Sequence, residues 1–326
     1  MSKFSIIIPC FNSGGFVDVC LERLSLLRYY HNLFEVIFVD DCSTDNTLEV
    51  LKKYKKTSEL NIRIIRNNVN SGPGVSRHNA AEIASGEYLC FCDSDDWYDS
   101  DFLKDVNEEL SRCESDLLIF DMSYVLNGKV IRKNYTAPFK YGDKMSYLSN
   151  CAESLCNLVV KRDLFLSIPI VDIRNGEDLA LVPLLIANAK HVTHIDKSYY
   201  NYLMRSDSAS LGRVAINSYN NMLLAFEHIR KHLKAESRDI EDCIEYLGIK
   251  TVLYNSTLMA IKGGNDNIIL KKIVRDFTAN YHGWSHNTLK CKLGIAKNLY
   301  LSALKYKLWF ICRMFVSLHT FLLTKR

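Results

Sequence analysis

The sequence lacks the features of a disulfide framework, a membrane span and a secretory leader. None of its 11 cysteines forms a CxxC pair, and their spacing is irregular, so buried reduced thiols are expected rather than disulfides. No run of about 20 uninterrupted apolar residues occurs, which argues against a spanning helix. The apolar run near the N-terminus is too short for the core of a signal peptide. These absences predict a cytoplasmic protein.

Acidic residues are missing from the C-terminal end, although the whole chain is nearly balanced. The 326 residues carry a net charge of only +4, which argues against a general nucleic-acid binder. No Asp or Glu follows Asp276, whereas basic residues continue to the end: Lys290, Lys292, Lys297, Lys305, Lys307, Arg313, Lys325 and Arg326. This asymmetry predicts an anionic partner for the C-terminal segment.

The first hundred residues alternate between two kinds of segment. Nearly continuous apolar runs rich in β-branched and aromatic residues predict buried strands at 4–11, 34–41, 61–67 and 87–93. Helices are expected between them, at 15–30, 45–57 and 73–85. Strand–helix alternation of this kind predicts an α/β fold with a parallel sheet and helices on both faces.

Polar side chains follow the expected strands at the point where each one ends. These residues are Asn12, Asp40, Asp41, Asn67 and Asp93. Ligands of open α/β sheets bind beyond the carboxyl ends of the strands. The sequence therefore predicts that these side chains line one crevice.

The remainder of the chain is expected to end in a separate helical part. A further strand is expected at 115–125 and a helix at 175–190, whereas 126–175 reads as a mixture of strands with a helix. From about residue 214 the pattern is helical throughout. We therefore place a domain boundary between 1–212 and 213–326.

The segment 87–101, EYLCFCDSDDWYDSD, sets three carboxylates directly after an apolar run. Grouping Asp93, Asp95 and Asp96 costs free energy through repulsion and desolvation. One interpretation is a solvated turn whose acids cap the next helix. Another is a phosphatase-type nucleophile, although Asp96 stands where that motif usually has Thr or Val. A third is a metal–diphosphate site, in which carboxylates hold Mg²⁺ or Mn²⁺ and the cation offsets the repulsion.

An EF-hand calcium loop is a fourth interpretation of the same segment. Acids occur at its first, third, seventh and ninth positions. The position that requires glycine holds Tyr98, however, and the position of the bidentate glutamate holds Lys104. The calcium interpretation is therefore disfavoured.

Four segments in order resemble the motifs of glycosyltransferase family 2. They are SIIIPCFN, EVIFVDDCSTDNT, NVNSGPGVSRHNAAEIASGEYLCFCDSDD and NGEDLALVPLLI. The resemblance covers about residues 4–210 and implies the GT-A fold and transfer of a sugar from a nucleotide donor with inversion. Cys42 departs from the pattern, because the family commonly has glycine there.

The resemblance implies a nucleotide-binding edge after the first two strands. Pro9, Phe11 and Asn12 would form it, with Phe11 against a uracil ring, and Asp40 would accept a hydrogen bond from the ring N–H. Capping of the following helix is the alternative for Asp40.

The third motif supplies the expected donor contacts. Arg77 would lie near the base and diphosphate, since its forked donors suit oxyanions. Asp93 would bind the donor ribose or sugar, and Asp95 would contact Mg²⁺ or Mn²⁺. Trp97 is expected either in the acceptor pocket or in the core.

The last motif matches the family's acidic motif for acceptor activation. Asp178 would be the base that takes the proton from the acceptor hydroxyl, and Glu177 would orient the acceptor. Pairing of both acids with the helix dipole is the alternative. Downstream, Arg205 would bind the donor diphosphate, with Tyr202 and Ser208 as further candidates.

The tail KYKLWFICRMFVSLHTFLLTKR is apolar with basic ends. Helical spacing places Arg313, Ser317 and Thr320 on one polar face, which predicts a basic amphipathic helix. Such a helix can lie in an anionic membrane surface, or it can pack on the protein or in a dimer, and the sequence leaves both open.

The resemblance to glycosyltransferase family 2 implies a metal-dependent inverting hexosyltransferase that uses a UDP-sugar. Its acceptor would be a glycan or lipid-linked glycan of a bacterial surface polymer, with lipopolysaccharide, capsule and exopolysaccharide all open. The enzyme would be cytoplasmic, or peripheral on the inner face of the membrane. Two alternatives remain, a nucleotidyl- or phosphotransferase and a non-catalytic scaffold of a glycan assembly complex.

Overall fold

We analysed a computed structural model of the chain. It describes residues 2–134, 144–150, 154–171, 173, 176–204, 216–233, 237–264 and 267–324. The chain divides into two compact units. Unit 1 comprises Met1–Tyr147 and Cys151–Ser208, and unit 2 comprises Leu148–Asn150 and Ala209–Arg326.

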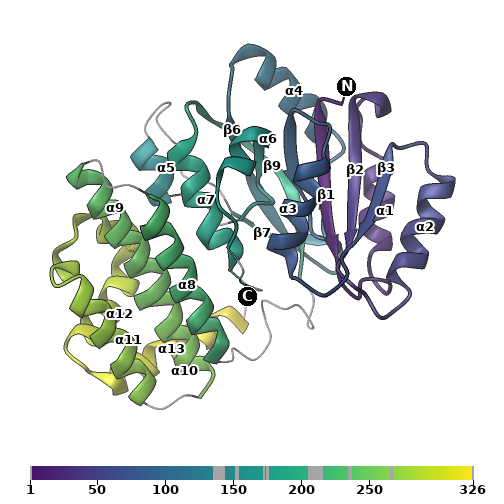
Figure 1. Cartoon of the computed structure of the whole chain (residues 1–326). Coiled ribbons are helices and arrows are strands. Elements are labelled where there is room, and N and C mark those ends of the chain that lie inside the picture. The colour runs from purple at the N-terminus through teal and green to yellow at the C-terminus, as the bar shows by residue number, and fades with distance from the viewer. Residues whose placement is uncertain are drawn as a thin grey trace. The chain divides into compact units, whose positions relative to one another are not determined.

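Unit 1 is built on one nine-stranded sheet in the order β3-β2-β1-β4-β8-β6-β9-β5, with β7 paired to β6 (Figure 1). The strands are β1 (Phe4–Cys10), β2 (Phe34–Asp40), β3 (Ile62–Arg66), β4 (Tyr88–Phe91), β5 (Trp97–Tyr98), β6 (Leu117–Leu126), β7 (Lys129–Asn134), β8 (Leu158–Lys161) and β9 (Val192–Leu203). The first four strands are parallel to one another, as the alternating pattern predicts.

The other half of the sheet is mixed rather than parallel. Strand β8 runs antiparallel to both of its neighbours, β4 and β6, whereas β9 is parallel to β6. The two-residue β5 and the strand β7 are antiparallel additions. The expected parallel sheet is therefore confirmed for β1–β4, and the region 126–175, which the sequence leaves unclear, supplies antiparallel pairing.

Helices cover both faces of this sheet. They are α1 (Asp18–Ser25), α2 (Thr47–Thr57), α3 (Pro73–Ile83), α4 (Phe102–Arg112), α6 (Arg162–Ser167) and α7 (Glu177–Asn188), with a 3-10 turn at His31–Leu33. Helix α5 (Lys144–Asn150) crosses the boundary between the two units. Helices α3, α6 and α7 contact one another, and α3 begins at Pro73, the expected first-turn proline.

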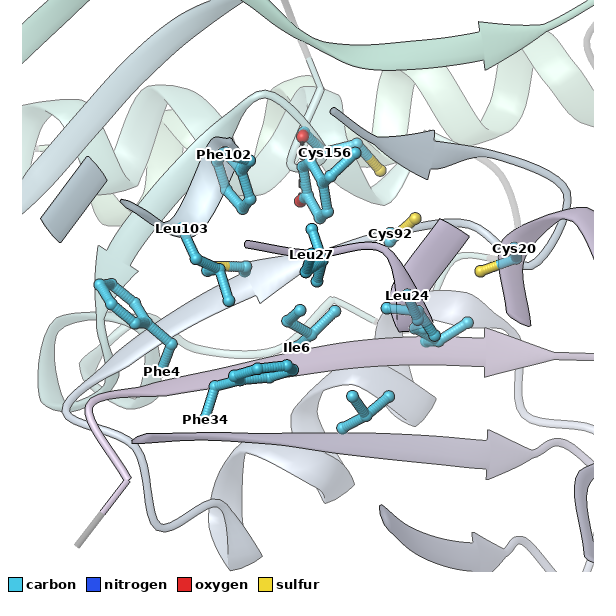
Figure 2. Packing of buried hydrophobic residues seen from close by; sticks show 14 of the residues in the cluster. Phe4, Ile6, Cys20, Leu24, Leu27, Phe34, Cys92, Phe102, Leu103 and Cys156 are labelled. Atoms are coloured by element: carbon cyan, nitrogen blue, oxygen red, sulfur yellow. Dashed lines mark hydrogen bonds between the residues drawn. The ribbon is translucent and has the colours of Figure 1, made fainter. Parts of the chain in front are cut away.

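The main core lies between the sheet and helices α1, α2 and α4. Alternate residues of β1 point into it, among them Phe4 and Ile6, and meet Leu24 and Leu27 at the end of α1 (Figure 2). The other face of β1 is equally buried, since Ile7 has no exposed surface. Burial of both faces explains why these strands read as continuous apolar runs.

Unit 2 is helical in its described residues. Its elements are α8 (Ile216–His232), α9 (Arg238–Gly248), the π-helical segment η2 (Ile249–Ser256), α10 (Thr257–Lys262), α11 (Asn267–Asn280), 3-10 turns at Trp284–His286 and Thr288–Leu293, α12 (Gly294–Lys305) and α13 (Trp309–Thr324). Gly248 permits close packing, because a Cβ there would lie 2.4 Å from Cζ of Phe226. The helical prediction for the C-terminal part therefore holds for these residues.

Helix α13 matches the predicted amphipathic tail only in part, because Ser317 is exposed as expected but Arg313 is not, and the side chain of Thr320 lies outside the described residues. Arg313 is half-buried, and its guanidinium donates to Oδ1 of Asn267 at 3.0 Å. Cys312 and Val316 are buried, whereas Phe310 and Met314 are exposed. The described part of α13 thus turns apolar residues outward, because packing inside unit 2 holds Arg313 inward.

Candidate active site

The ends of β1, β2 and β4 meet at one edge of the sheet, as expected from their parallel order. Cys10, the last residue of β1, is paired with Asp40 of β2. The loop after β1 is tied to the loop after β4 by a 2.8 Å hydrogen bond between the hydroxyls of Ser13 and Ser94. These contacts bring the first two motifs beside the acidic cluster.

The three acids of the cluster have different environments. Asp96 is fully buried, and its carboxylate accepts hydrogen bonds from the Tyr200 hydroxyl at 2.6 Å and the Leu203 amide at 2.7 Å. Burial, followed by the charges of Asp93 and Asp95, raises the pKa of Asp96 well above its usual value. Asp93 and Asp95 are only partly buried. Asp96 is therefore an anchor for the end of β9, whereas Asp93 and Asp95 each keep part of their surface exposed.

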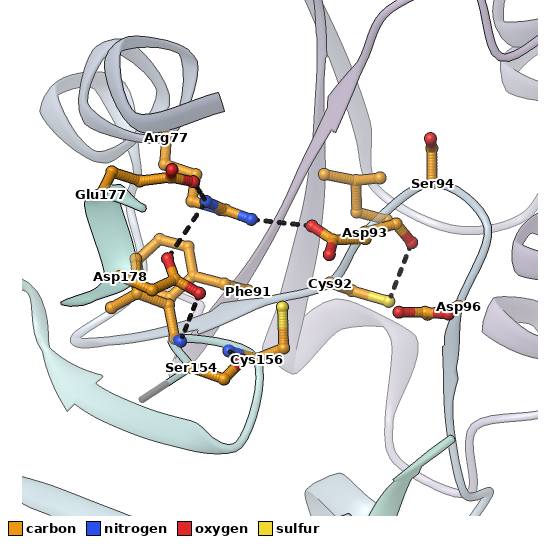
Figure 3. Close-up of polar contacts among 12 residues, drawn as sticks. Arg77, Phe91, Cys92, Asp93, Ser94, Asp96, Ser154, Cys156, Glu177 and Asp178 are labelled. Atoms are coloured by element: carbon orange, nitrogen blue, oxygen red, sulfur yellow. Dashed lines mark hydrogen bonds and ion pairs between the residues drawn. The ribbon is translucent and has the colours of Figure 1, made fainter. Parts of the chain in front are cut away.

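Arg77 on α3 joins the donor motif to the acidic motif on α7. Its side chain is 3% exposed, and its two terminal nitrogens lie 2.7 Å from Asp93 Oδ1 and 2.6 Å from Glu177 Oε1 (Figure 3). The nitrogen that binds Glu177 also lies 3.5 Å from Asp178 Oδ1. One buried cation thus holds three carboxylates, and two of them lie about a hundred residues away from it in the sequence.

The observed geometry favours positioning of carboxylates as the role of Arg77. The sequence predicts a nucleotide contact for this residue, but the guanidinium is buried and its terminal nitrogens face Asp93, Glu177 and Asp178. A direct contact with the donor stays a prediction. We interpret Arg77 as a positioning residue for the carboxylates on either side of it.

Asp178, the predicted general base, is partly exposed and has polar neighbours on both carboxylate oxygens. It lies in the first turn of α7, which begins after Gly176 in a left-handed conformation (φ +97°). Its Oδ1 faces Arg77, its Oδ2 accepts the Leu155 amide at 3.1 Å, and its side chain is 21% exposed. Burial raises the pKa of Asp178 to about 7, opposed by Arg77 and reinforced by Glu177 and Asp93. A carboxylate of this pKa can accept a proton near neutral pH.

The residues of the predicted nucleotide-binding edge differ in their exposure and in their contacts within the protein. Phe11 is 46% exposed, so its ring is accessible to a stacking partner. Asn12 has a left-handed backbone (φ +49°), and its side-chain Oδ1 accepts the Thr44 amide at 2.9 Å. Pro9 is part of β1, paired with Val39.

Asp40 is fully buried, and its carboxylate already has two partners. The Ser43 amide donates to Oδ1 at 3.1 Å, and the half-exposed Arg66 places Nε 3.1 Å from Oδ2. Oδ2 accepts no hydrogen bond from the described residues, and the contact between Asp40 and a base N–H stays a prediction. Asp41 instead orders the next loop, accepting the Ser71 and Gly72 amides.

The carboxylates fit a divalent cation only when a substrate completes the ligand set. Among the described residues, no group of three or more His, Cys, Asp and Glu side chains is arranged to hold a metal ion. Mg²⁺ and Mn²⁺ commonly bind one or two protein carboxylates together with substrate phosphate oxygens. The partly exposed Asp95, next to Asp93, matches that donor set.

Three residues of the site carried no clear signal in the sequence. The Tyr200 hydroxyl donates to the Asp96 carboxylate and accepts the Asp93 amide at 3.2 Å. The sequence pointed to Tyr202 and the residues after it, and not to Tyr200. Arg66 and Leu155 act through an ion pair and a backbone amide, which only the fold brings to the site. Two predicted residues, Arg205 and Ser208, lie outside the part of the chain that the structure describes. The Tyr202 ring lies 5.4 Å from that of Tyr124.

Trp97 lines a cavity of about 360 Å³, together with Arg23, Tyr98, Asp99 and Lys197 among others. The Arg23 guanidinium lies 5.7 Å from the centre of the indole. The ring is therefore partly in the core and partly accessible. Its assignment to an acceptor pocket stays a prediction.

Comparisons with known proteins agree with this architecture. The chain is 32% identical over 208 residues to the poly(ribitol-phosphate) beta-N-acetylglucosaminyltransferase TarS of Staphylococcus aureus (strain MW2), covering 61% of this chain and 35% of that protein. It is 31% identical over 246 residues to the poly(ribitol-phosphate) beta-glucosyltransferase of Bacillus spizizenii, covering 74% and 38%. The chain thus spans little more than a third of the length of these two relatives.

Solved structures share the fold. The crystal structure of S. aureus TarS 1-349 in complex with UDP-GlcNAc has a TM-score of 0.68 at 22% identity, covering 94% of this chain and 88% of that one. The mannosyltransferase PcManGT from Pyrobaculum calidifontis in complex with GDP-Man and Mn²⁺ has a TM-score of 0.58 at 14% identity, covering 96% and 84%. The model of glycosyl transferase family 2 matches residues 5–168, which include β2–β4, all of β1 but its first residue, and the acidic cluster. The chain belongs to glycosyl transferase family 2.

Proposed function

We propose that this protein is an inverting glycosyltransferase that moves a sugar from a UDP-sugar to a hydroxyl of a bacterial surface polymer. The observation that carries the proposal is the bridge from Asp93 through Arg77 to Asp178. Through this bridge Asp178, whose pKa burial raises to about 7, shares its arginine partner with Asp93 of the donor motif. An acid of this kind beside a donor site suits proton removal from an attacking hydroxyl.

The transfer step assigns each group one role. The acceptor oxygen forms a bond to the anomeric carbon while the bond from that carbon to the diphosphate oxygen breaks. The hydroxyl proton passes to Asp178, and the bonding electrons leave with UDP. Glu177, held by Arg77 at 2.6 Å, orients the acceptor. Because attack and departure occur on opposite faces, the anomeric configuration inverts.

The donor end of the site carries the proposed metal dependence. Asp95 would hold Mg²⁺ or Mn²⁺ with the donor phosphates, and the cation would offset charge on the departing diphosphate. Phe11 would stack on the base, with Pro9, Asn12 and Asp40 beside it and Asp93 at the ribose or sugar. Arg205 remains the candidate for the diphosphate. The partly exposed acids beside the buried Asp96 support this division of roles.

The acceptor is the least constrained part of the proposal. The S. aureus and B. spizizenii relatives are both named for poly(ribitol phosphate) and for β-linked transfer, which supports a polyol-phosphate surface polymer over lipopolysaccharide. A processive diacylglycerol beta-glycosyltransferase of Mycoplasma genitalium is 26% identical over 252 residues, covering 70% of this chain and 71% of that protein. We propose that the acceptor is carried on a lipid and that the enzyme works peripherally at the inner membrane face.

Replacement of Asp95 by alanine tests the donor site. We expect wild-type protein to bind one member of a UDP-sugar panel in the presence of Mn²⁺ and to lose that binding on chelation. Asp95→Ala should weaken metal-dependent binding by about a hundredfold, since one carboxylate ligand is lost. Isothermal titration calorimetry measures this, with Asp163→Ala, which removes an exposed acid elsewhere, as the control. Equal affinities with and without metal would contradict the proposed role of Asp95.

A further inference from the structure

The described residues of unit 2 expose an unusual series of large apolar side chains along α12 and α13. Helix α12 exposes Ile295 (83%) and Leu299 (65%). Helix α13 exposes Phe310 (74%), Met314 (56%) and Leu318 (59%). Each set has helical spacing of four residues, so each forms a stripe on one face of its helix.

The two stripes lie on the side away from the interior of unit 2. Helix α12 packs inward through Tyr300, whose hydroxyl hydrogen-bonds Thr257 of α10 at 2.8 Å. Helix α13 also contacts α10, and its Phe315 ring lies 4.9 Å from that of Tyr300. Both helices thus bury the side that faces α10, and each stripe lies on the exposed side of its own helix. We call Ile295, Leu299, Tyr306, Leu308, Phe310, Ile311, Met314 and Leu318 the hairpin surface.

The charge beside the hairpin surface has one sign. Lys305 and Lys307 are exposed at the turn of the same hairpin, and Lys307 has a left-handed backbone (φ +58°). Lys297 of α12 lies instead over the Tyr254 ring, 5.0 Å from its centre. No acidic residue follows Asp276 in the sequence. An apolar stripe flanked by lysines matches the interface of a bilayer, where acyl chains lie beneath anionic headgroups.

We propose that the hairpin surface docks on anionic lipid, with Phe310, Met314 and Leu318 in the headgroup–acyl boundary and the lysines at the phosphates. Helix α13 has 16 residues, and no described helix is long and apolar enough to cross a bilayer, so it would lie in the plane of the interface. A second copy of the chain fits less well, because a symmetric contact would bring the lysines of both copies together. This inference rests on the proposed function only for its purpose, which is to hold the enzyme near a lipid-carried acceptor.

Flotation of the full chain with vesicles tests the surface. Wild type should bind vesicles of equal parts phosphatidylglycerol and phosphatidylcholine and bind phosphatidylcholine alone far more weakly. Phe310→Ser/Leu318→Ser should reduce binding to the anionic vesicles about tenfold, because two exposed apolar anchors are lost. The matched control is Leu224→Ser/Ile268→Ser, which alters two exposed apolar residues of unit 2 outside the surface (53% and 71%) and should bind as wild type does.

Reversing the charge of two lysines tests the electrostatic contribution to vesicle binding separately from the apolar one. Lys305→Glu/Lys307→Glu should also lower anionic-vesicle binding about tenfold, while Lys52→Glu/Lys53→Glu on α2 should leave it unchanged. Equal binding by all four variants, or a change of oligomeric state on light scattering with no vesicle binding by wild type, would overturn the proposal. UDP-sugar hydrolysis measured without vesicles keeps the two claims apart. Vesicle binding without hydrolysis would leave the docking surface standing and count against the transferase.

Discussion

Asp178→Asn should lower the rate of sugar transfer by a factor of about a hundred to ten thousand, the range typical for loss of a general base. The asparagine amide keeps the shape of the side chain and can still accept the Leu155 N–H through its oxygen, but it cannot take a proton from the acceptor. Donor affinity should stay near that of wild type, since Asp178 acts on the acceptor. Initial rates of UDP release, with donor affinity from calorimetry, measure both quantities.

Asp116→Asn is the matched control for this variant. Asp116 is a comparably shielded carboxylate, 16% exposed, that accepts two backbone amides, from Lys190 and His191, and it lies outside the proposed site. The same chemical change there should leave transfer unaltered. A wild-type rate in Asp178→Asn, or an equal loss in both variants, would exclude Asp178 as the base.

Arg77→Gln should have the second large effect, on stability and on pH dependence together. Removing a buried cation leaves Asp93, Glu177 and Asp178 without their common partner, and breaking a buried pair in this way costs about 3–5 kcal/mol. Burial raises the pKa of Asp178 to about 7, and Arg77 is the main influence that lowers it. Without the arginine this pKa should rise further, so the pH of half-maximal transfer should move upward.

Urea denaturation and pH–rate profiles measure the two parts of this prediction. The base must be ionised to act, so the wild-type rate should rise as pH increases through about 7. Arg77→Lys keeps a charge but not the fork and should fall between wild type and Arg77→Gln. Arg63→Gln, which removes an ion pair with the buried Glu35 at 3.7 Å, should leave the pH midpoint in place. An unchanged midpoint in a folded Arg77→Gln protein would contradict the positioning role.

The sequence could predict those parts of the site that depend on local pattern. Buried parallel strands read as apolar runs, so their ends, and with them Asp40 and Asp93, could be located. Asp178 could be placed in a first helical turn because Gly176 and the following apolar period mark the start of α7. The rest depends on contacts between distant segments. The three carboxylates around Arg77 come from elements that meet only in the folded chain, and the antiparallel insertion of β8 between β4 and β6 has no local signature.

The C-terminal helix shows the same limit. Its periodicity was sufficient to predict a helix with basic and apolar residues, but not which face is exposed. The contact of Arg313 with Asn267 and the burial of Cys312 and Val316 set the rotation of α13. Helical spacing alone treats polar residues as outward-facing, whereas packing in unit 2 turns Phe310 and Met314 outward.

The anomeric configuration of the product tests the central claim most directly. Full-length protein would be incubated with Mn²⁺, poly(ribitol phosphate) and UDP-GlcNAc or UDP-glucose, and the product examined by NMR. The account predicts release of UDP and a sugar joined with inverted, β configuration. A retained configuration would contradict the single-displacement role of Asp178, and release of pyrophosphate or a phosphorylated product instead of UDP would contradict the transferase itself.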